Sequence, residues 1–249
     1  MSAPASPSAT GPRLGCAAVI VGAGRGHRLG GGTPKQYLPL DGSCALRLAV
    51  EAFLATGRID AVVPVIHPDD KALCLTALDG LDETRVLAPV PGGDTRARSV
   101  RRGLEAIEAL APARVLVHDA ARPFVPGAVI GAVIDALDTH EGACAALPVV
   151  DAIWRADDGP NGDMARAPVP REGLWRAQTP QGFAFDAILA AHRAHDGTGA
   201  DDVAVAVEAG LDVAFVPGSE RGYKITTAAD LARARAEIER GVAHEERAS

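Results

Sequence analysis

Short apolar runs of strand length alternate with amphipathic stretches along almost the whole chain. Four such runs lie at residues 17–21, 61–66, 114–118 and 144–150. Between them, apolar residues recur at helical spacing, as at Val100, Leu104, Ile107 and Leu110. A continuous apolar run is typical of a strand buried on both faces, as in a parallel sheet. The alternation therefore predicts an α/β fold with a single domain: an open, mainly parallel, twisted, Rossmann-like sheet with helices on both faces.

Length and local composition divide the chain into one domain and two tails. The 249 residues, 47% of them hydrophobic, can bury one sizeable core. We expect a disordered tail at residues 1–14, the domain at 15–242 and a frayed end at 243–249. Residues 151–171 are rich in Asp, Gly, Pro and Asn, which predicts a protruding arm or hairpin, although a plain mobile loop fits this composition equally well. Thr227 and Asp230 have the spacing of a capping box that starts a last helix.

Charge and cysteine usage exclude several classes of function. The net charge of −7 argues against binding a nucleic-acid backbone, which usually needs a basic surface. The four cysteines show no CxxC spacing, so we expect no zinc site or disulfide framework and predict a cytoplasmic location. The apolar run at residues 16–21 is too short for a membrane span or a signal peptide. A small phosphorylated ligand remains compatible with this charge, because it needs only a few cations in one cleft.

The segment directly after the first predicted strand is rich in glycine and carries two cations. Residues 22–30 read GAGRGHRLG, and Lys35 follows Arg28 by seven residues. Glycine lets backbone N–H groups approach a phosphate closely. A dinucleotide fingerprint fails because His27 and Leu29 stand where it needs glycine, and a Walker A loop fails because Lys35 follows a proline. A phosphate cradle with cations that stabilise a phosphoryl-type transition state remains, with a flexible surface loop as the alternative.

This loop resembles the signature of the 2-C-methyl-D-erythritol 4-phosphate cytidylyltransferase family of the non-mevalonate isoprenoid pathway. That family has a strand, an A-A-G-x-G-x-R turn and then P-K-Q-[YF]-L; this chain has GAGRGHR at 22–28 and PKQYL at 34–38. The resemblance implies a nucleotidyltransferase that uses CTP as co-substrate, with Arg28 and Lys35 as catalytic residues at the α-phosphate. It also implies CTP contacts from the loop residues Gly22, Ala23, Gly24 and Gly26. Gly22 in place of the first alanine is a mild departure.

A second motif lies at residues 92–100, which read GGDTRARSV and lead into a predicted helix. The family has G-G-x-x-R-x-x-S-V here, and the resemblance implies that Gly93, Asp94 and Ser99 select cytosine over larger bases. On local grounds, Asp94 or Thr95 is also a good N-cap residue. The two interpretations are compatible.

The run HDAARP at residues 118–123 matches the family most specifically. Asp119 ends a predicted strand, and open α/β sheets bind ligands beyond the carboxyl ends of their strands. A carboxylate there can hold Mg²⁺ directly or through water, although it could instead cap the turn. By the resemblance, Ala120 leaves room beside the nucleotide and Arg122 helps position the acceptor substrate. We interpret His118 as a packed strand-end residue rather than a proton carrier.

Two further motifs concern the acceptor phosphate. Residues 174–183, LWRAQTPQGF, match the family's L-W-x-A-x-T-P-Q-x-F, and Arg171 stands just before them. The family's arm exchanges between subunits, so the resemblance implies a homodimer in which Arg171 grips the acceptor in the partner's site. Residues 222–227, GYKITT, are similar to N-I-K-[VI]-T, which gives Lys224 the role of positioning the acceptor phosphate. Alone, either residue would be interpreted as a solvated surface cation.

The chain departs from the family pattern at three positions that concern the acceptor. Ala152 replaces the threonine of a D-T pair, and Ala200 and Ala204 replace two hydroxyl residues of T-D-[DE]-A-[ST]. A lost neutral hydrogen bond costs about 0.5–1.5 kcal/mol, so these changes bear on acceptor identity and catalytic efficiency while the CTP half stays intact.

The motifs together predict transfer of CMP from CTP to 2-C-methyl-D-erythritol 4-phosphate, with release of pyrophosphate. Three alternatives stay open: a ribitol 5-phosphate cytidylyltransferase, a non-catalytic nucleotide-binding paralogue, and a nucleotide-sugar pyrophosphorylase that uses another nucleotide. The expected partners are small-molecule substrates and a second copy of the chain.

Overall fold

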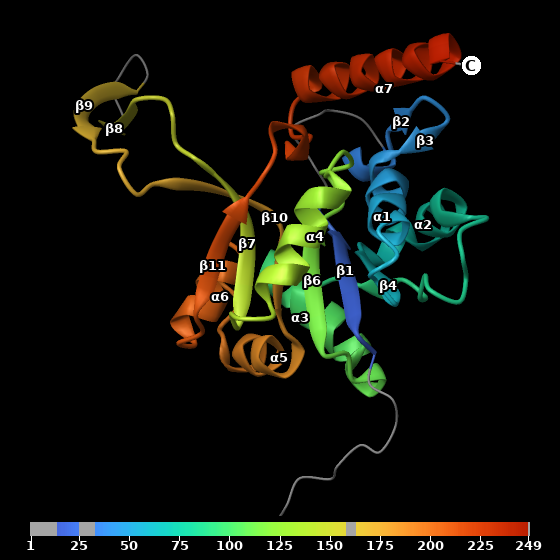
Figure 1. Cartoon of the computed structure of the whole chain (residues 1–249), viewed down its shortest axis with the longest axis horizontal. Coiled ribbons are helices and arrows are strands. Elements are labelled where there is room, and N and C mark those ends of the chain that lie inside the picture. Colours follow the sequence, from blue (N-terminus) through green and yellow to red (C-terminus); the bar gives the residue numbers. More distant parts are fainter. Residues whose placement is uncertain (1–13, 25–32, 158–162, 249) are drawn as a thin grey trace, which may run out of the picture.

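A seven-stranded sheet forms the centre of the computed structural model, which describes residues 14–24, 33–157 and 163–248 (Figure 1). Its strand order is β11-β7-β10-β6-β1-β4-β5. The strands are β1 (Cys16–Gly22), β4 (Ala61–Ile66), β5 (Val90–Pro91), β6 (Arg114–Asp119), β7 (Gly142–Pro148), β10 (Trp175–Ala184) and β11 (Val213–Pro217). All neighbouring pairs are parallel except those of β10, which runs antiparallel to β6 and β7. The predicted mainly parallel α/β sheet is confirmed.

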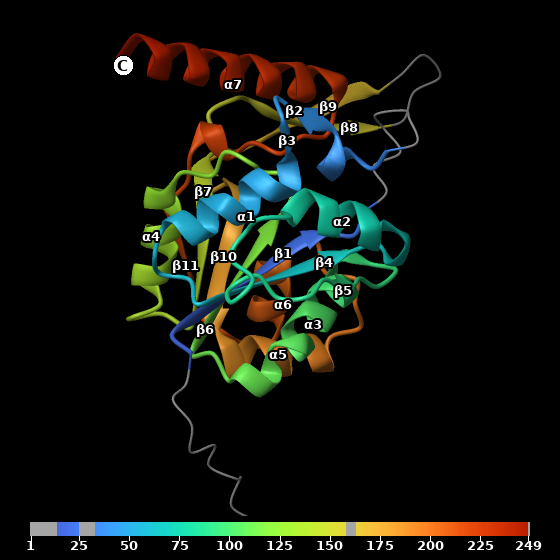
Figure 2. The ribbon, with the colours of Figure 1, turned by 90° about the vertical axis from the view of Figure 1, so that its right-hand side faces the viewer.

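Helices cover both faces of this sheet, as predicted (Figures 1 and 2). One face carries α1 (Ala45–Ala55), α2 (Lys71–Leu78) and α4 (Gly127–Ala136), and the other carries α3 (Arg96–Ala106), α5 (Phe185–Ala194) and α6 (Asp202–Glu208). Successive side chains of a strand point to opposite faces, so β1 serves both cores. Ala18 and Ile20 pack into the first core, whereas Ala17 and Val19 pack into the second.

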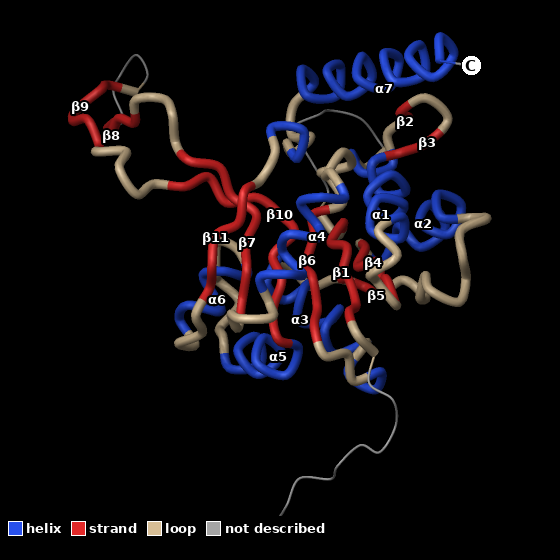
Figure 3. Tube along the Cα trace, in the orientation of Figure 1, coloured by secondary structure: helices blue, strands red, loops and turns tan. Residues whose placement is uncertain are grey.

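The remaining elements are peripheral to the sheet and are best followed in the tube drawing (Figure 3). Within the described residues they include the short pair β2 (Pro39–Leu40) and β3 (Ser43–Cys44), the 3₁₀ turns η2 (Lys35–Tyr37), η3 (Pro68–Asp70), η4 (Glu108–Leu110) and η5 (Glu220–Gly222), and the last helix α7 (Ala228–Ala248). Thr227 and Asp230 exchange backbone-to-side-chain hydrogen bonds of 2.8 and 3.2 Å, which is the predicted capping box at the start of α7. This helix continues to Ala248, into the segment for which the sequence predicts frayed residues.

The predicted arm is a two-stranded antiparallel hairpin that projects away from the sheet (Figure 1). Its strands are β8 (Ile153–Asp157) and β9 (Met164–Val169), and nearly all of their residues are exposed. Residues 1–13 of the predicted tail at 1–14, residues 158–162 between β8 and β9, and Ser249 lie outside the described residues. Among the described residues, no helix combines the length and the apolar character that a membrane span requires.

Close helix–sheet contact depends on one glycine of α3. A Cβ atom at Gly103 would lie 2.5 Å from a methyl group of Val19 and 2.7 Å from one of Val65. Because both valines belong to the buried core, neither can move away without disturbing β1 or β4. The glycine therefore sets how closely α3 approaches the sheet, and hence where the start of this helix lies.

We expect Gly103→Ala to lower the free energy of unfolding by about 1–3 kcal/mol, because overpacking outweighs the gain in helix propensity. Chemical denaturation monitored by circular dichroism measures this change. Gly131→Ala in α4 is the matched control, since its added Cβ would meet only Arg58 at 3.6 Å. That variant should be neutral or slightly stabilising, and equal destabilisation of both variants would contradict the packing argument.

Candidate active site

A pocket opens at the carboxyl ends of β1 and β6, where open α/β sheets bind ligands. The start of α3, the segment just before it, the turn η2 and the segment before α7 complete the wall. The lining residues are Val21, Gly22, Ala23, Gly24, Lys35, Gln36, Gly93, Asp94, Thr95, Arg96, Ser99, Asp119, Ala120, Ala121 and Lys224. Ten of the residues singled out from the sequence are among them, so segments distant in the chain meet as the ordered motifs predict. Their individual roles stay predictions.

The segment before α3 is shaped by its own polar groups. Ser99 accepts a hydrogen bond from the Gly93 N–H at 3.0 Å and donates to the carbonyl of Thr95 at 2.9 Å. Thr95, rather than Asp94, caps the helix, because its hydroxyl accepts from the N–H of Arg98 at 3.1 Å. The Asp94 carboxylate instead pairs with Arg98 at 2.7 Å. The backbone of this segment is thus fixed beside the N-terminus of α3, an end that favours anions.

Two glycine-rich segments approach each other closely at the pocket. A Cβ atom at Gly92 would lie 2.4 Å from the methyl group of Ala23 and 2.8 Å from the hydroxyl of Ser99. Only glycine fits between these neighbours, so residue 92 must be glycine for the loop after β1 and the start of α3 to share one wall.

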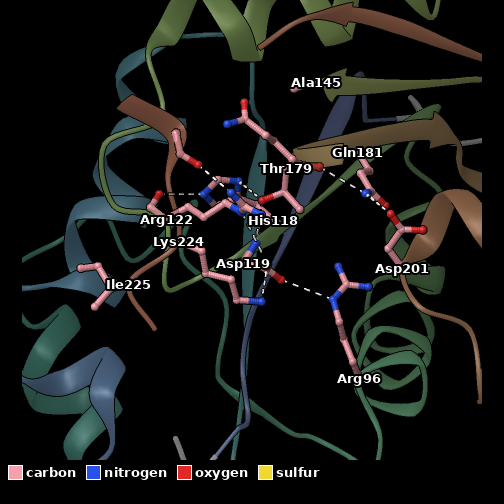
Figure 4. Close-up of polar contacts among 12 residues, drawn as sticks. Arg96, His118, Asp119, Arg122, Ala145, Thr179, Gln181, Asp201, Lys224 and Ile225 are labelled. Atoms are coloured by element: carbon pink, nitrogen blue, oxygen red, sulfur yellow. Dashed lines mark hydrogen bonds and ion pairs between the residues drawn. The ribbon is translucent and has the colours of Figure 1, made fainter. Parts of the chain in front are cut away.

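Asp119 is buried at the end of β6 and faces three cations (Figure 4). Its Oδ2 lies 2.8 Å from Lys224 Nζ and 3.6 Å from Arg122 Nε, and its Oδ1 lies 3.3 Å from Arg96 Nε. Burial alone would raise the pKa of Asp119, but Arg96, Lys224 and Arg122 outweigh burial and hold that pKa well below its usual range. The group is therefore an anion in a cationic surrounding, with excess positive charge available to a phosphate ligand.

A buried hydrogen-bond chain fixes the backbone beside this carboxylate. Thr179 of β10 accepts from the Asp119 N–H at 3.1 Å and meets His118 Nδ1 at 2.9 Å. His118 Nε2 lies 3.0 Å from the carbonyl of Arg122, which accepts its proton if Nδ1 accepts from Thr179. Burial lowers the pKa of His118 to about 4, so the ring is neutral. These contacts agree with the interpretation of His118 as a packed strand-end residue.

Lys35 and Gln36 join the loop after β1 to a segment near the C-terminus. Lys35 Nζ donates to the carbonyl of Ile225 at 3.0 Å, and Gln36 donates from its buried amide to the carbonyl of Gly22 at 2.6 Å. Lys35 therefore lies next to the segment that carries Lys224, and both ammonium groups line the pocket.

Four of the predicted residues are not placed at the pocket wall. Arg122 lies behind it, where it contacts Asp119 and donates to the carbonyl of Gly222 at 2.7 Å. Arg171 follows β9 at the base of the arm and bonds the carbonyl of Val150, away from the pocket of its own chain. Gly26 and Arg28 lie outside the described residues.

The sequence reasoning missed three residues that shape the site. Arg96 is the arginine of the GGDTRARSV motif, and its place in that motif was the signal that could have identified it. Gln36 and Thr179 stand in the PKQYL and LWRAQTPQGF motifs, but no local pattern shows what a side chain contacts across the sheet. Among the described residues, no group of three or more His, Cys, Asp and Glu is placed to hold a metal ion.

We expect Thr179→Val to lower the free energy of unfolding by about 1–3 kcal/mol, because it strands the buried N–H of Asp119. Thermal and chemical denaturation measure the loss. Thr139→Val removes an exposed hydroxyl that bonds a helix-end carbonyl and serves as the control. Equal losses of unfolding free energy in both variants would show that the buried hydrogen bonds of Thr179 do not stabilise the end of β6.

The chain is similar to known proteins over most of its length. A model of the 2-C-methyl-D-erythritol 4-phosphate cytidylyltransferase family matches residues 16–240. The chain is 51% identical over 220 residues to a bifunctional enzyme IspD/IspF of Rhodobacter capsulatus, covering 88% of this chain and 55% of that relative. It therefore spans about half the length of such bifunctional relatives. It is also 49% identical to a 2-C-methyl-D-erythritol 4-phosphate cytidylyltransferase of Cereibacter sphaeroides, covering 88% of this chain and 94% of that one.

Solved structures of similarly named proteins match the fold of this chain. The crystal structure of a 2-C-methyl-D-erythritol 4-phosphate cytidylyltransferase from Thermus thermophilus matches with a TM-score of 0.70 and 30% identity, over 91% of this chain and 100% of that one. A 4-diphosphocytidyl-2C-methyl-D-erythritol synthase from Anaerococcus prevotii matches with a TM-score of 0.76 and 26% identity, over 91% and 99% of the two chains. The chain thus belongs to the 2-C-methyl-D-erythritol 4-phosphate cytidylyltransferase family.

Proposed function

We propose that the protein transfers the CMP group of CTP to 2-C-methyl-D-erythritol 4-phosphate and releases pyrophosphate, as a step of isoprenoid precursor synthesis. The observation that carries the proposal is the convergence of Lys35, Lys224 and Arg96 with buried Asp119 in one pocket walled by glycine-rich backbone. Family membership supports it. Such a pocket can neutralise a triphosphate that undergoes substitution.

The reaction needs positioning and charge stabilisation rather than proton chemistry. An oxygen of the acceptor phosphate attacks the α-phosphorus of CTP in line, a new P–O bond forms, and the bond to the leaving pyrophosphate breaks. The attacking phosphate is already anionic, so no general base is required. Lys35 and Arg28 stabilise the charge on the α-phosphate, and Lys224, with Arg122 behind it, positions the acceptor phosphate.

The nucleotide base would lie against the segment before α3. There hydrogen bonds hold the Gly93 N–H and the Ser99 hydroxyl in fixed positions on either side of Asp94, and Ala120 adds little bulk. A fixed, narrow set of backbone groups favours a small pyrimidine over a purine. We assign cytosine selection to this segment.

Asp119 fits the role of holding Mg²⁺, directly or through water, because Mg²⁺ takes one or two protein carboxylates and completes its shell with substrate phosphates and water. When bound, the ion supplies neutralisation of charge on the phosphates. The three cations around Asp119 repel a divalent ion until the phosphates of a bound substrate neutralise part of their positive charge. Metal and triphosphate are therefore expected to bind together.

The arm supports a homodimer. A single hairpin is marginally stable in water, and this one exposes Trp154 and Met164 to 56% and 52%. A second copy that covers these side chains would stabilise the hairpin and bring Arg171 to the acceptor side of the partner's pocket. All four cysteines are buried free thiols, which supports a cytoplasmic location.

The function is tested by measuring pyrophosphate release with CTP, UTP, ATP and GTP, each against 2-C-methyl-D-erythritol 4-phosphate, ribitol 5-phosphate and a sugar 1-phosphate. We expect turnover only with CTP and the erythritol phosphate. Turnover with ribitol 5-phosphate would transfer the proposal to that acceptor, whereas turnover with UTP and a sugar phosphate would replace it. CTP binding without turnover for any pair would indicate a nucleotide-binding paralogue.

Lys35→Ala should lower kcat by about 10²–10³-fold, since it removes a fixed cation from the developing charge. Steady-state kinetics measures this loss, and circular dichroism verifies the fold. Lys71→Ala, at an exposed position at the start of α2, is the control and should keep full turnover. Near-normal kcat in Lys35→Ala would remove this lysine from the mechanism.

Isothermal titration of the free protein with Mg²⁺ should give no saturable binding heat, because three cations already surround Asp119. With CTP present, Mg²⁺ should bind and tighten the nucleotide, and Asp119→Asn should weaken that dependence. Saturable Mg²⁺ binding to the free protein would contradict the electrostatic argument.

Sedimentation should find a dimer that Trp154→Asp weakens, because a charge would be buried in the arm interface. Leu75→Asp, at a position 53% exposed on α2, is the control.

If Arg171 acts in the partner's site, mixing inactive Lys35→Ala and Arg171→Ala proteins should restore part of the activity. A monomer, or no recovery on mixing, would overturn exchange of the arm.

A further inference from the structure

Asp202 is a carboxylate of α6 that the mechanism above does not use, although it is completely buried. Its Oδ2 lies 2.8 Å from Arg96 Nη2, and its Oδ1 lies 3.2 Å from Nε2 of His192, a buried residue of α5. An ionised carboxylate is costly to bury unless charged partners and hydrogen bonds compensate. Here the compensation comes from a guanidinium that itself lines the pocket.

The backbone of Asp202 is also fixed, from the strand next to the one that carries Asp119. Gln181 of β10 is buried, and its Oε1 accepts from the N–H groups of Asp202 at 3.0 Å and Val203 at 3.1 Å. The same amide donates to Asp201 Oδ2 at 3.0 Å, a contact that is visible in Figure 4. The start of α6 is therefore tied to the central sheet, which fixes the backbone from which the Asp202 side chain extends.

Arg96 is consequently held at two of its three nitrogen atoms. Its Nη2 binds Asp202 and its Nε binds Asp119, while its Nη1 has no hydrogen-bond partner within the described part of the chain. The side chain is 24% exposed and lines the pocket. A guanidinium can donate from each edge, so the remaining N–H groups are available to an anion.

The charges around the pocket agree with an anionic ligand. Arg96, Arg122 and Lys224 carry three positive charges against the two negative charges of Asp119 and Asp202. With Asp119 alone, three cations would share one carboxylate. Because of the second carboxylate, Arg96 keeps a fixed partner when a phosphate enters and attracts the other cations of the cluster.

We propose that Asp202 is a positioning residue that holds Arg96 with its remaining N–H groups at the pocket, where Arg96 binds a phosphate oxygen of a substrate. The identity of that substrate rests on the proposed function. The bound oxygen belongs either to the triphosphate or to the acceptor phosphate, and the two sources are separable by experiment. This arrangement also gives the 200–204 segment a role in supporting Arg96.

The test compares Arg96→Lys, Asp202→Asn and the double variant with the wild-type protein. Calorimetry with CTP alone, with the acceptor alone and with inorganic pyrophosphate is combined with kcat and both KM values. We expect each single variant to weaken one phosphate ligand about tenfold or more, because a charged hydrogen bond is lost. The double variant should lose no more than Arg96→Lys, because Asp202 acts through Arg96. Weaker CTP binding identifies the triphosphate, and a raised acceptor KM alone identifies the acceptor.

Asp138→Asn is the control for loss of a carboxylate that pairs with an arginine, because the Arg114–Asp138 pair lies at the surface outside the pocket. It should leave all binding and kinetic constants unchanged. Where Asp202→Asn fails to fold, Arg96→Ala with added guanidinium provides the second arm. Guanidinium should restore phosphate binding, since the Asp202 carboxylate can still bind the free guanidinium ion. Methylammonium at the same concentration should not restore it.

Several outcomes would overturn the proposal. These are additive losses in the double variant, unchanged affinity of Arg96→Lys for every phosphate ligand, or no rescue by guanidinium in a folded Arg96→Ala. The binding measurements do not depend on turnover. Absence of CMP transfer in the wild-type protein would therefore refute the proposed function and still leave the role of Arg96 to be decided by calorimetry.

Discussion

The ion cluster at Asp119 is the constraint on which the rest of the site depends. A buried carboxylate at a strand end must be compensated, and here a helix start, a turn and the segment before the last helix each contribute one cation. These three elements are distant in the chain and meet only because β6 lies in the middle of the sheet. The cluster therefore holds the parts of the pocket together and also leaves positive charge at its surface.

The apolar strands could be predicted from the sequence because burial on both faces leaves a direct signal. Residues 61–66 are a strand with the predicted bounds, whereas the predicted run at 144–150 begins earlier, at Gly142, and ends at Pro148. The antiparallel strand β10 gave no such signal. Its inward side chains include Gln178, Thr179 and Gln181, which are buried and satisfied by hydrogen bonds to other segments. Periodicity detects apolar burial, and it cannot detect polar burial of this kind.

The site was predictable to the extent that its residues stand in contiguous motifs. Resemblance places Lys35, Asp119 and Lys224 together, and the structure brings them to one pocket. The pairing of Arg96 with Asp202 spans 106 positions and joins two helices that no local pattern connects. Sequence reasoning assigned the 200–204 segment to the acceptor on the basis of its missing hydroxyls. What the spacing could not show is that its second carboxylate turns inward, toward a guanidinium.

The last helix is attached to the rest of the molecule by a small apolar cluster of its own. Leu40, Ala45, Ile225 and Ala234 form its buried part, separate from the two large clusters on the faces of the sheet. Opening this cluster exposes far less apolar surface than unfolding the sheet, so its local opening free energy lies below that of global unfolding. Lys224 precedes Ile225, and Lys35 bonds the Ile225 carbonyl. Both ammonium groups are therefore tied to a segment whose own apolar anchorage is much smaller than that of the sheet, so local opening of this segment would displace both cations together.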